Sequence, residues 1–462
     1  MQKENFTIII MGITGDLTKT KLIPALYELL KQKRAEQFFI VGVARSVKEI
    51  ADVLESAKTN IKNVDEEVWG RLKAISSKYN LDFYKPEDYQ SLKAHIEAQE
   101  TKENFSGNRI FYLATGSENF DAIHENLAKA KLVNAAKGWQ RVVYEKPFGH
   151  NLQSAKQLDA CISAVLSEKN IYRADHYLGK EMIGSIALFR FTNRILEPLW
   201  SRKDIDHIEI IIDEDFGIKN RGNYYDKYGA VKDILQSHAL QMLALIAIES
   251  PKRLTGEFLR DVKAQVLKKI KIDSIVLGQY EGYLQEAFVA KDSKTETFFA
   301  AKLLINTKRW CGVPFYVRSG KNLNKKETVV HIRFKDVDCL LSKTCPSDNN
   351  YLTIKISPDE SFDLEVNTKI AHKDYEIQTI HLDYEHRTKN EIGNADDYAM
   401  LIEQVILGEQ SFFIRRDEIE YSWKIIDAID LKKQSVFPYA IGSNGPKEFQ
   451  EWNKKNNVFW KS

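Results

Sequence analysis

"FTIIIMGITGDLTKTKLIPALYELLKQK", residues 6–33, passes from an apolar run through a turn with two glycines into a helical pattern. The run at residues 6–12 is apolar nearly throughout, which is typical of a parallel strand covered on both faces. Gly12 and Gly15 allow a tight turn and a close approach of the backbone to a ligand. The helix that follows offers N–H groups and a positive dipole to a phosphate. Any α/β protein can carry such a turn, and the spacing departs from G-x-G-x-x-G, so this stretch alone leaves the ligand open.

Similar apolar runs recur at residues 38–45, 81–84, 109–115 and 141–148, with helical patterns between them. Repeated strand–helix–strand units predict a doubly wound parallel sheet. We therefore expect an α/β Rossmann-type dinucleotide-binding domain over residues 1–174.

The pattern changes after this domain. A long helical stretch at residues 229–250 is followed by alternating strand-like runs such as 298–306, 328–334 and 351–356. Alternation with turn-rich connections indicates antiparallel strands. We expect a larger α+β domain over residues 175–462, with a mostly antiparallel sheet. Since no Pro-rich linker separates the two domains, they are expected to share a cleft.

The overall composition narrows the class of protein. Among 462 residues, 67 Lys and Arg balance 65 Asp and Glu, which argues against a nucleic-acid or membrane-surface partner. The chain has four cysteines, which form no C-x-x-C pair: Cys161, Cys311, Cys339 and Cys345. Their wide spacing favours a reducing compartment and no metal site. The chain shows no signal-peptide pattern, and its longest apolar run, residues 242–248, is far too short to span a membrane. We expect a cytoplasmic protein.

The end of the second apolar run bears on the choice of cofactor. It reads "ARS", so Arg45 and Ser46 stand where a dinucleotide fold that prefers NAD places an acidic residue. A guanidinium suits the dianionic 2′-phosphate of NADP. The position favours NADP over NAD, and a solvated arginine at a strand end is the alternative.

The fifth run ends in "EKPFG", residues 145–149, at the edge of the sheet where doubly wound folds bind ligands. An X–Pro bond adopts the cis form at little cost. A cis Lys146–Pro147 bond would turn Lys146 toward the nicotinamide end of a cofactor. A plain strand stop at Pro147 is the alternative.

"YRADHYLGKE", residues 172–181, gathers four polar side chains that can do chemistry. If residues 176–181 form a helical turn, His176, Tyr177 and Lys180 can converge on one anion and donate to it. Asp175 would not face a bound phosphate. It can instead orient an imidazole, as the acid does in a nucleophile–His–Asp arrangement.

The long helical stretch supplies a candidate imidazole in His238, with Asp233 five residues earlier. On an α-helix these residues stand about 140° apart, so they are poor partners for each other but can flank one substrate. A histidine in so apolar a helix is more often a satisfied core residue. Two further polar segments, one with Glu214 and one with Lys321 and Lys326, could close the site, and solvated loops are the alternative there.

The chain resembles the glucose-6-phosphate dehydrogenase family nearly from end to end. The motifs that carry the resemblance are "GITGDLTKTKLIPALYEL", "VGVARS", "FYLA", "EKPFG", "YRADHYLGKE", "RGNYYDKYGAVKDILQSHALQMLAL", "GVPFYVRSGKNL" and "FFIRRDEIEYSWKIID". The resemblance implies oxidation of glucose 6-phosphate at C1 to 6-phosphoglucono-δ-lactone with NADP, the first step of the oxidative pentose phosphate pathway. It further implies a homodimer or tetramer assembled through the sheet domain, and NAD as a weaker alternative cofactor.

The resemblance also assigns roles residue by residue. His238 corresponds to the general base and Asp175 to its orienting carboxylate. The positions that bind the substrate are His176, Tyr177 and Lys180 for the phosphate, Glu214, Asp233, Lys321 and Lys326 for the sugar or its phosphate, and Lys146 between sugar and cofactor. The positions that bind the cofactor are Gly12, Thr14, Gly15, Asp16, Lys21, Arg45, Tyr112, Glu145 and Lys146.

The departures from the family pattern are small. Thr20 replaces a basic residue of the phosphate loop, Lys232 replaces an arginine and Ala174 replaces a larger aliphatic residue. None of them removes a residue assigned to the chemistry. Two rival functions share the fold: another two-domain sugar oxidoreductase with its own "EKP" strand end, and a non-catalytic NADP-binding sensor.

Overall fold

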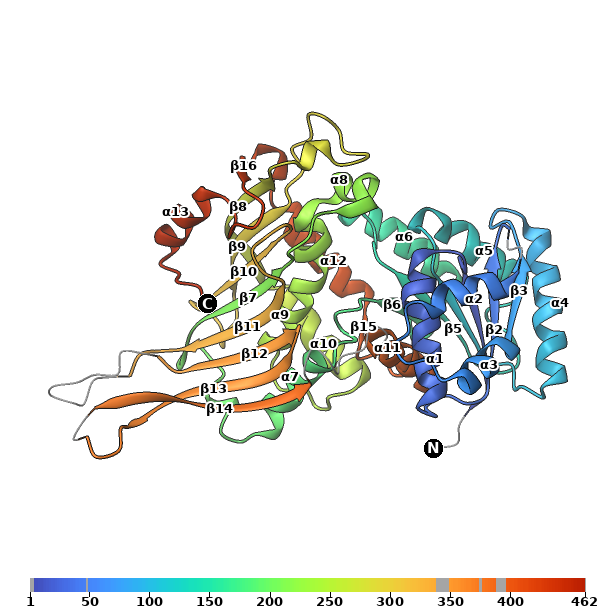
Figure 1. Cartoon of the computed structure of the whole chain (residues 1–462), viewed down its shortest axis with the longest axis horizontal. Helices are drawn as coiled ribbons and strands as arrows, with labels where there is room; N and C mark the ends of the chain where they lie inside the picture. The colour runs from blue at the N-terminus through green and yellow to red at the C-terminus, as the bar shows by residue number, and fades with distance from the viewer. Residues whose placement is uncertain (1–3, 47–48, 338–348, 374–375, 388–395, 462) are drawn as a thin grey trace. The chain divides into compact units, whose positions relative to one another are not determined.

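The computed structural model describes residues 4–46, 49–337, 349–373, 376–387 and 396–461, and most of its helices and strands are labelled in Figure 1. The chain divides into two compact units. The first unit comprises Met1–Glu181, Arg253–Arg260 and Gly393–Glu420, and the second comprises Met182–Lys252, Asp261–Ile392 and Tyr421–Ser462. Two later segments of the chain therefore belong with the N-terminal part. Among the described helices, none is long and apolar enough to cross a membrane.

The first unit contains a seven-stranded sheet of order β15-β6-β5-β4-β1-β2-β3. Its strands are β1 (Phe6–Met11), β2 (Phe38–Ala44), β3 (Ser76–Asn80), β4 (Arg109–Leu113), β5 (Gln140–Glu145), β6 (Ile171–Ala174) and β15 (Phe413–Ile414). All pairs are parallel except β15 with β6, which confirms the doubly wound fold. Side chains of β1, β2 and β4 are buried throughout, which explains why these strands read as continuous apolar runs.

Helices connect these strands. They are η1 (Thr18–Leu22, a π-helix), α1 (Ile23–Lys31), α2 (Ile50–Lys58), α3 (Glu66–Ala74), α4 (Pro86–Lys102), α5 (Phe120–Lys129), α6 (Leu152–Val165) and α11 (Asp396–Leu407), with short 3₁₀ turns η2 (Ser117–Asn119) and η3 (Glu168–Asn170). Tyr398, Leu401 and Val405 of α11 belong to the same apolar core as Tyr27 and Leu30 of α1. This shared core explains why the segment that contains α11 folds with the first unit.

The third strand lies earlier than the sequence predicts. It spans Ser76–Asn80, at the edge of the sheet beside β2, and residues 81–84 form no strand. An edge strand needs backbone partners more than apolar side chains, so the polar segment "SSKYN" can form it. Leu81 and Phe83 are buried just beyond its end, which is why their apolar character suggested a strand.

The second unit contains a nine-stranded sheet of order β14-β13-β12-β11-β7-β10-β9-β8-β16. Its strands are β7 (Ile205–Asp213), β8 (Ile270–Tyr280), β9 (Phe298–Ile305), β10 (Pro314–Gly320), β11 (Glu327–Phe334), β12 (Tyr351–Ser357), β13 (Glu360–Lys369), β14 (Ile377–Arg387) and β16 (Val436–Tyr439). Six of the eight neighbouring pairs are antiparallel, and β7–β10 and β8–β16 are parallel. The mostly antiparallel sheet is therefore confirmed.

The remaining helices are α7 (Glu181–Thr192), α8 (Gly222–Ala230), η6 (Val231–Ala239, a π-helix), α9 (Leu240–Ala247), α10 (Gly256–Leu267), α12 (Arg416–Asp427) and α13 (Lys447–Asn456), with 3₁₀ turns η4 (Glu197–Leu199), η5 (Lys219–Arg221), η7 (Tyr283–Gln285) and η8 (Leu431–Lys433). α10 and α12 each contribute residues to both units. Cys161 and Cys311 are free thiols, and Cys339 and Cys345 lie outside the described residues.

The long helical stretch at residues 229–250 is not one α-helix. The chain breaks at Gly229, whose φ of 66° and ψ of 178° separate α8 from η6. In a π-helix hydrogen bonds join residues five apart, so Asp233 and His238 lie close to one turn apart on the same side. The angle of about 140° expected from α-helical geometry is therefore wrong for this pair.

Candidate functional site

The loop after β1 is bound closely to its neighbours in the sheet. Gly12 has a φ of 107°, and a Cβ atom there would collide with the carbonyl of Ala114. The amides of Gly12 and Ile13 both donate to the carbonyl of Val43, at 2.8 and 3.0 Å. Glycine is required here by its conformation and by the close packing of three strand ends.

The other predicted cofactor residues of this loop lie toward solvent. Thr14 and Asp16 are exposed, while Gly15 and Lys21 are half-buried. Arg45 directly follows β2, which neighbours β1 in the sheet, and its side chain is exposed. The loop and Arg45 therefore share the carboxyl edge of the sheet, where this fold binds nucleotides.

Tyr112 and Glu145 lie near the carboxyl ends of the adjacent parallel strands β4 and β5. The Tyr112 hydroxyl donates to Glu145 Oε1 at 2.5 Å. Burial raises the pKa of Glu145 to about 7, against the opposing effect of this hydrogen bond. The carboxyl group can therefore change its protonation state near neutral pH.

Lys146 and Asp175 follow two strands that are in register. Glu145 pairs with Ala174 in the parallel ladder of β5 and β6, so Lys146 and Asp175 are the next residues of adjacent strands. The Lys146–Pro147 peptide bond is cis. The structure thus brings together two residues that the sequence predicted separately.

Residues 175–180, which we call the 175–180 turn, form successive tight turns of 3₁₀ type rather than an α-helical turn. The amides of Leu178, Gly179 and Lys180 donate three residues back, to the carbonyls of residues 175–177, and α7 begins only at Glu181. Asp175 Oδ1 accepts from the Tyr177 amide at 3.0 Å, and the Asp175 side chain is buried. An Asx-type hydrogen bond therefore competes with helix formation at this position.

The 175–180 turn gathers His176, Tyr177 and Lys180. The His176 and Tyr177 rings lie 4.9 Å apart, and the Lys180 ammonium lies 5.7 Å from the centre of the Tyr177 ring. Lys180 Nζ also contacts Asp397 Oδ2 of α11 at 3.1 Å. The Tyr398 ring is parallel to that of His176 at 6.4 Å. Asp397 and Tyr398 are not predicted from the sequence, because it is the shared core of α11 and α1 that places them here.

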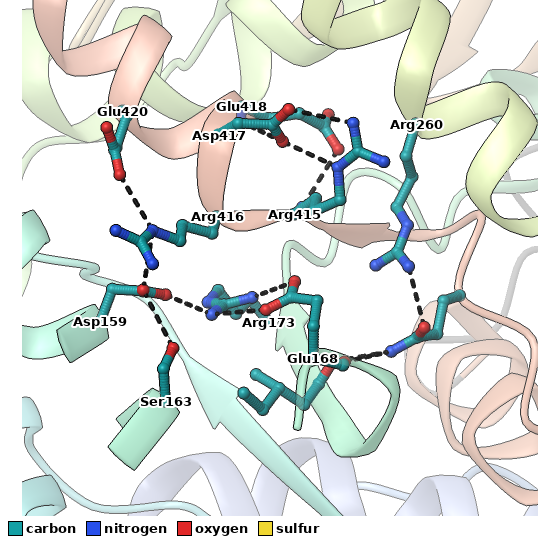
Figure 2. Close-up of polar contacts among 12 residues, drawn as sticks. Asp159, Ser163, Glu168, Arg173, Arg260, Arg415, Arg416, Asp417, Glu418 and Glu420 are labelled. Atoms are coloured by element: carbon teal, nitrogen blue, oxygen red, sulfur yellow. Dashed lines mark hydrogen bonds and ion pairs between the residues drawn. The ribbon is translucent and has the colours of Figure 1, made fainter. Parts of the chain in front are cut away.

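A buried arginine, Arg173, holds the strand β6 through ion pairs that Figure 2 draws. Arg173 of β6 contacts Asp159 Oδ1 of α6 at 2.5 Å and Glu168 Oε1 at 2.7 Å, with 2% of its side chain exposed. Arg416, at the start of α12, contacts Asp159 Oδ2 at 3.0 Å. β15 pairs with the same strand. β6 is therefore held both by the ion pairs of Arg173 and by backbone pairing along its edge.

In the second unit, η6 carries Asp233 and His238, and both side chains are buried. The Tyr224 hydroxyl of α8 donates to Asp233 Oδ1 at 3.1 Å. Tyr224, which the sequence alone does not single out, therefore contacts the predicted site residue Asp233. Its only sequence signal was its place in the "RGNYYDKYG" segment that precedes the helix.

The segments with Glu214 and Lys321 are neighbours because β7 and β10 are parallel. Asp213 pairs with Gly320 at the strand ends, so Glu214 and Lys321 emerge side by side and form an ion pair. The ammonium groups of Lys321 and Lys326 lie 5.5 and 5.6 Å from the centre of the Phe216 ring.

Tyr225 links this group to η6. Burial raises the pKa of Tyr225 well above its usual range, and the carboxylates of Asp233 and Glu214 raise it further. The Lys321 ammonium lies 5.1 Å from the centre of the Tyr225 ring. The second unit therefore gathers carboxylates, lysines and aromatic rings, which are the groups that bind a sugar phosphate.

Comparison with known proteins identifies the family. The model "Glucose-6-phosphate dehydrogenase, NAD binding domain" matches residues 9–184, and the model "Glucose-6-phosphate dehydrogenase, C-terminal domain" matches residues 187–461. Glucose-6-phosphate 1-dehydrogenase of Bacillus subtilis (strain 168) is 37% identical over 483 aligned residues, covering 99% of both chains. Glucose-6-phosphate 1-dehydrogenase 5, cytoplasmic, of Arabidopsis thaliana is 37% identical, covering 98% of this chain and 91% of its own.

A solved structure described as glucose-6-phosphate dehydrogenase in complex with its substrate glucose-6-phosphate has a TM-score of 0.91 and 32% identity. The match covers 100% of this chain and 99% of that one. Both halves of the sequence match models of this family, and the whole fold matches a solved structure of a member. The chain belongs to the glucose-6-phosphate dehydrogenase family.

Proposed function

We propose that this protein oxidises glucose 6-phosphate at C1 to 6-phosphoglucono-δ-lactone with hydride transfer to NADP⁺, the first step of the oxidative pentose phosphate pathway. The observation that carries the proposal is the similarity over 99% of both chains to the Bacillus subtilis glucose-6-phosphate 1-dehydrogenase. Every residue assigned to the chemistry is present. Reduced nicotinamide formation tests it, measured with glucose 6-phosphate and with glucose, and with NADP and NAD side by side. A preference for free glucose would instead favour another sugar oxidoreductase, and cofactor binding without turnover would favour a sensor.

In the proposed reaction His238 takes the proton of the C1 hydroxyl as hydride leaves C1, and Asp175 orients its imidazole. A positioned base contributes about 10²–10⁴-fold to the rate of such a step. The carboxylate would hold the ring in the correct tautomer and stabilise the imidazolium that forms. When bound, the nicotinamide supplies the hydride acceptor.

His176, Tyr177 and Lys180 would hold the phosphate of the substrate. Glu214, Asp233, Lys321 and Lys326 would contact the sugar or its phosphate, and Lys146 would lie between sugar and cofactor. Since the phosphate is far from C1, its binding energy can position the reacting carbon.

Lys180→Ala is expected to raise KM for glucose 6-phosphate by about 10–100-fold, with a smaller change in kcat, because a charged hydrogen bond contributes about 1.5–3 kcal/mol. Removal of the ammonium also leaves the Asp397 carboxylate beside the phosphate. Lys302→Ala is the matched control, since Lys302 contacts Asp273 Oδ2 at 3.2 Å in the second sheet. Initial rates against substrate concentration check the result, and an unchanged KM in Lys180→Ala removes this lysine from the phosphate site.

Two features of the first unit support a phosphorylated dinucleotide as the cofactor. The loop after β1 packs closely against the neighbouring backbone at Gly12. The exposed Arg45 occupies the position where an NAD-specific fold has an acidic residue. Gly12, Thr14, Gly15, Asp16, Lys21, Arg45, Tyr112, Glu145 and Lys146 would form the cofactor site. We propose NADP as the preferred cofactor and NAD as a weaker one.

Arg45→Ala is expected to raise KM for NADP by about 10–100-fold and to leave KM for NAD nearly unchanged, because only NADP carries the 2′-phosphate. Arg71→Ala controls for the loss of an exposed arginine of the same unit, since its guanidinium contacts the Glu36 carbonyl instead. The ratio of kcat/KM for the two cofactors is the measurement. Equal losses with both would contradict the assigned role.

The assembly is proposed as a homodimer or tetramer formed through the second sheet. β14 lies at the edge of that sheet, and Leu382 and Tyr384 on it are 56% and 63% exposed. Exposed edge strands with apolar side chains are usually covered by a partner. We further propose a cytoplasmic location, as in the name of the Arabidopsis relative, and functional domains at residues 1–174 and 175–462.

A further inference from the structure

The start of η6 is capped from outside its own segment. Ala230, which precedes the helix, makes no side-chain cap. Instead, Glu296 accepts hydrogen bonds from the backbone amides of both Ala230 and Val231. Its carbonyl accepts from the Ala230 amide at 3.0 Å, and its Oε1 accepts from the Val231 amide at 3.0 Å. A helix start otherwise leaves such donors unsatisfied, so one residue from a distant loop completes the helix that carries Asp233 and His238.

Gly229 makes room for this cap. A Cβ atom on Gly229 would collide with the Glu296 carboxyl group. Its φ of 66° is also unfavourable for other residues. The kink between α8 and η6 and the carboxyl group of Glu296 therefore depend on each other.

The residue after Glu296 fixes the other wall of the second-unit site. The Thr297 carbonyl accepts from the Lys321 amide at 3.0 Å. Tyr439 donates to the Lys321 carbonyl at 2.7 Å, and its hydroxyl lies 2.9 Å from Thr297 Oγ1. Glu296 thus contacts the start of η6, and Thr297 contacts Lys321. Both residues belong to one short segment just before β9.

We propose that Glu296 is a positioning residue, which holds η6 at the angle that His238 and Asp233 need and couples that helix to Lys321. The proposal rests on the proposed function, in which His238 is the base. Glu296 itself would touch neither substrate nor cofactor.

The ionisation of Glu296 supports a pH-dependent effect. Burial raises its pKa to about 7, while the Val231 amide and the Lys232 charge on η6 oppose the shift. Tyr225 of α8 and Tyr283 of η7 are the other titratable groups that interact with it. Between pH 4.5, the ordinary pKa, and about 7, the folded protein keeps a proton that the unfolded chain has released. The protonated carboxyl group therefore stabilises the folded protein at low pH, and this contribution to the free energy of unfolding is lost as the pH rises through 7. Above that pH the ionised carboxylate is the stronger hydrogen-bond acceptor for the Val231 amide of η6.

Two substitutions at Glu296 separate positioning from simple loss of stability. Glu296→Ala is expected to lower kcat by about 10–100-fold, since small misplacements of a base are costly. Glu296→Gln keeps an oxygen for the Val231 amide, so at pH 8 its kcat should stay within about threefold of the parent. Its activity should also fall less steeply from pH 8 to pH 6, because residue 296 then carries no group that titrates in that range. Equal loss of kcat in both variants, or an unchanged pH profile in Glu296→Gln, would overturn the proposal.

Asp226→Asn is the matched control. Asp226 lies in α8 before the kink and accepts from the Tyr283 hydroxyl at 3.0 Å and the Ala290 amide at 3.2 Å, so these two bonds anchor the same loop at points other than η6. Its kcat should be unchanged, and a loss equal to that in Glu296→Ala would also overturn the proposal.

Hydrogen exchange adds a readout that needs no turnover. Peptides over residues 229–240 should exchange faster in Glu296→Ala than in Glu296→Gln or Asp226→Asn. Equal protection would refute the cap even if the protein were inactive. Absence of glucose 6-phosphate oxidation by the parent protein would instead refute the proposed function.

Discussion

His238→Ala is expected to lower kcat for glucose 6-phosphate oxidation by about 10²–10⁴-fold, with a much smaller change in KM, because the base acts mainly in the transition state. His238 is 1% exposed on a π-helix that also carries Asp233. Steady-state rates at saturating substrate and cofactor measure the effect.

His331→Ala provides the control for loss of a buried histidine. His331 lies in β11, where burial lowers its pKa to about 3, and its Nδ1 is 2.9 Å from Thr353 Oγ1. This variant should lose stability and keep its kcat. A His238→Ala protein with near-parental kcat would show that another group removes the proton.

Asp175→Asn is expected to lower kcat by about 10²-fold or more, because the amide cannot stabilise an imidazolium or select the reactive tautomer. Asparagine keeps an oxygen where Asp175 Oδ1 accepts from the Tyr177 amide at 3.0 Å, so the 175–180 turn should persist. If Asp175 acts through His238, the double variant should be little slower than His238→Ala alone.

Glu100→Gln is the matched carboxylate control for Asp175→Asn. Glu100 is buried and its Oε2 contacts Arg109 Nη2 at 2.6 Å, at the amino end of β4 rather than the carboxyl edge. The substitution should affect the temperature of unfolding and not kcat. If Asp175→Asn and His238→Ala lowered kcat independently, so that their effects multiplied in the double variant, the proposed role of Asp175 in orienting His238 would be contradicted.

Much of the first unit could be predicted from the sequence because its strands are buried on both faces. β1, β2 and β4 therefore read as unbroken apolar runs. β3 could not be found this way, since backbone pairing with β2 forms it from half-exposed polar residues. β15 could not be found either, because two residues carry no periodic signal and only its pairing with β6 defines it.

The sequence predicts site residues mainly where several polar side chains stand close together in one short motif. His176, Tyr177 and Lys180 are close in the sequence and lie on one turn. Asp397 lies 217 residues away from Lys180, and only the fold makes them partners. Glu296 and Gly229 meet through a loop, and the π-helical spacing of Asp233 and His238 follows from the observed backbone. Such long-range contacts leave no local pattern in a single sequence.

Hydride transfer from C1 can be followed directly with glucose 6-phosphate that carries deuterium at C1. After incubation with NADP⁺, mass spectrometry of the reduced cofactor measures the origin of the transferred hydrogen. We predict one deuterium in the reduced cofactor and a lactone product without it. Reduced cofactor without deuterium, or no reduced cofactor from glucose 6-phosphate at all, would contradict the proposed reaction.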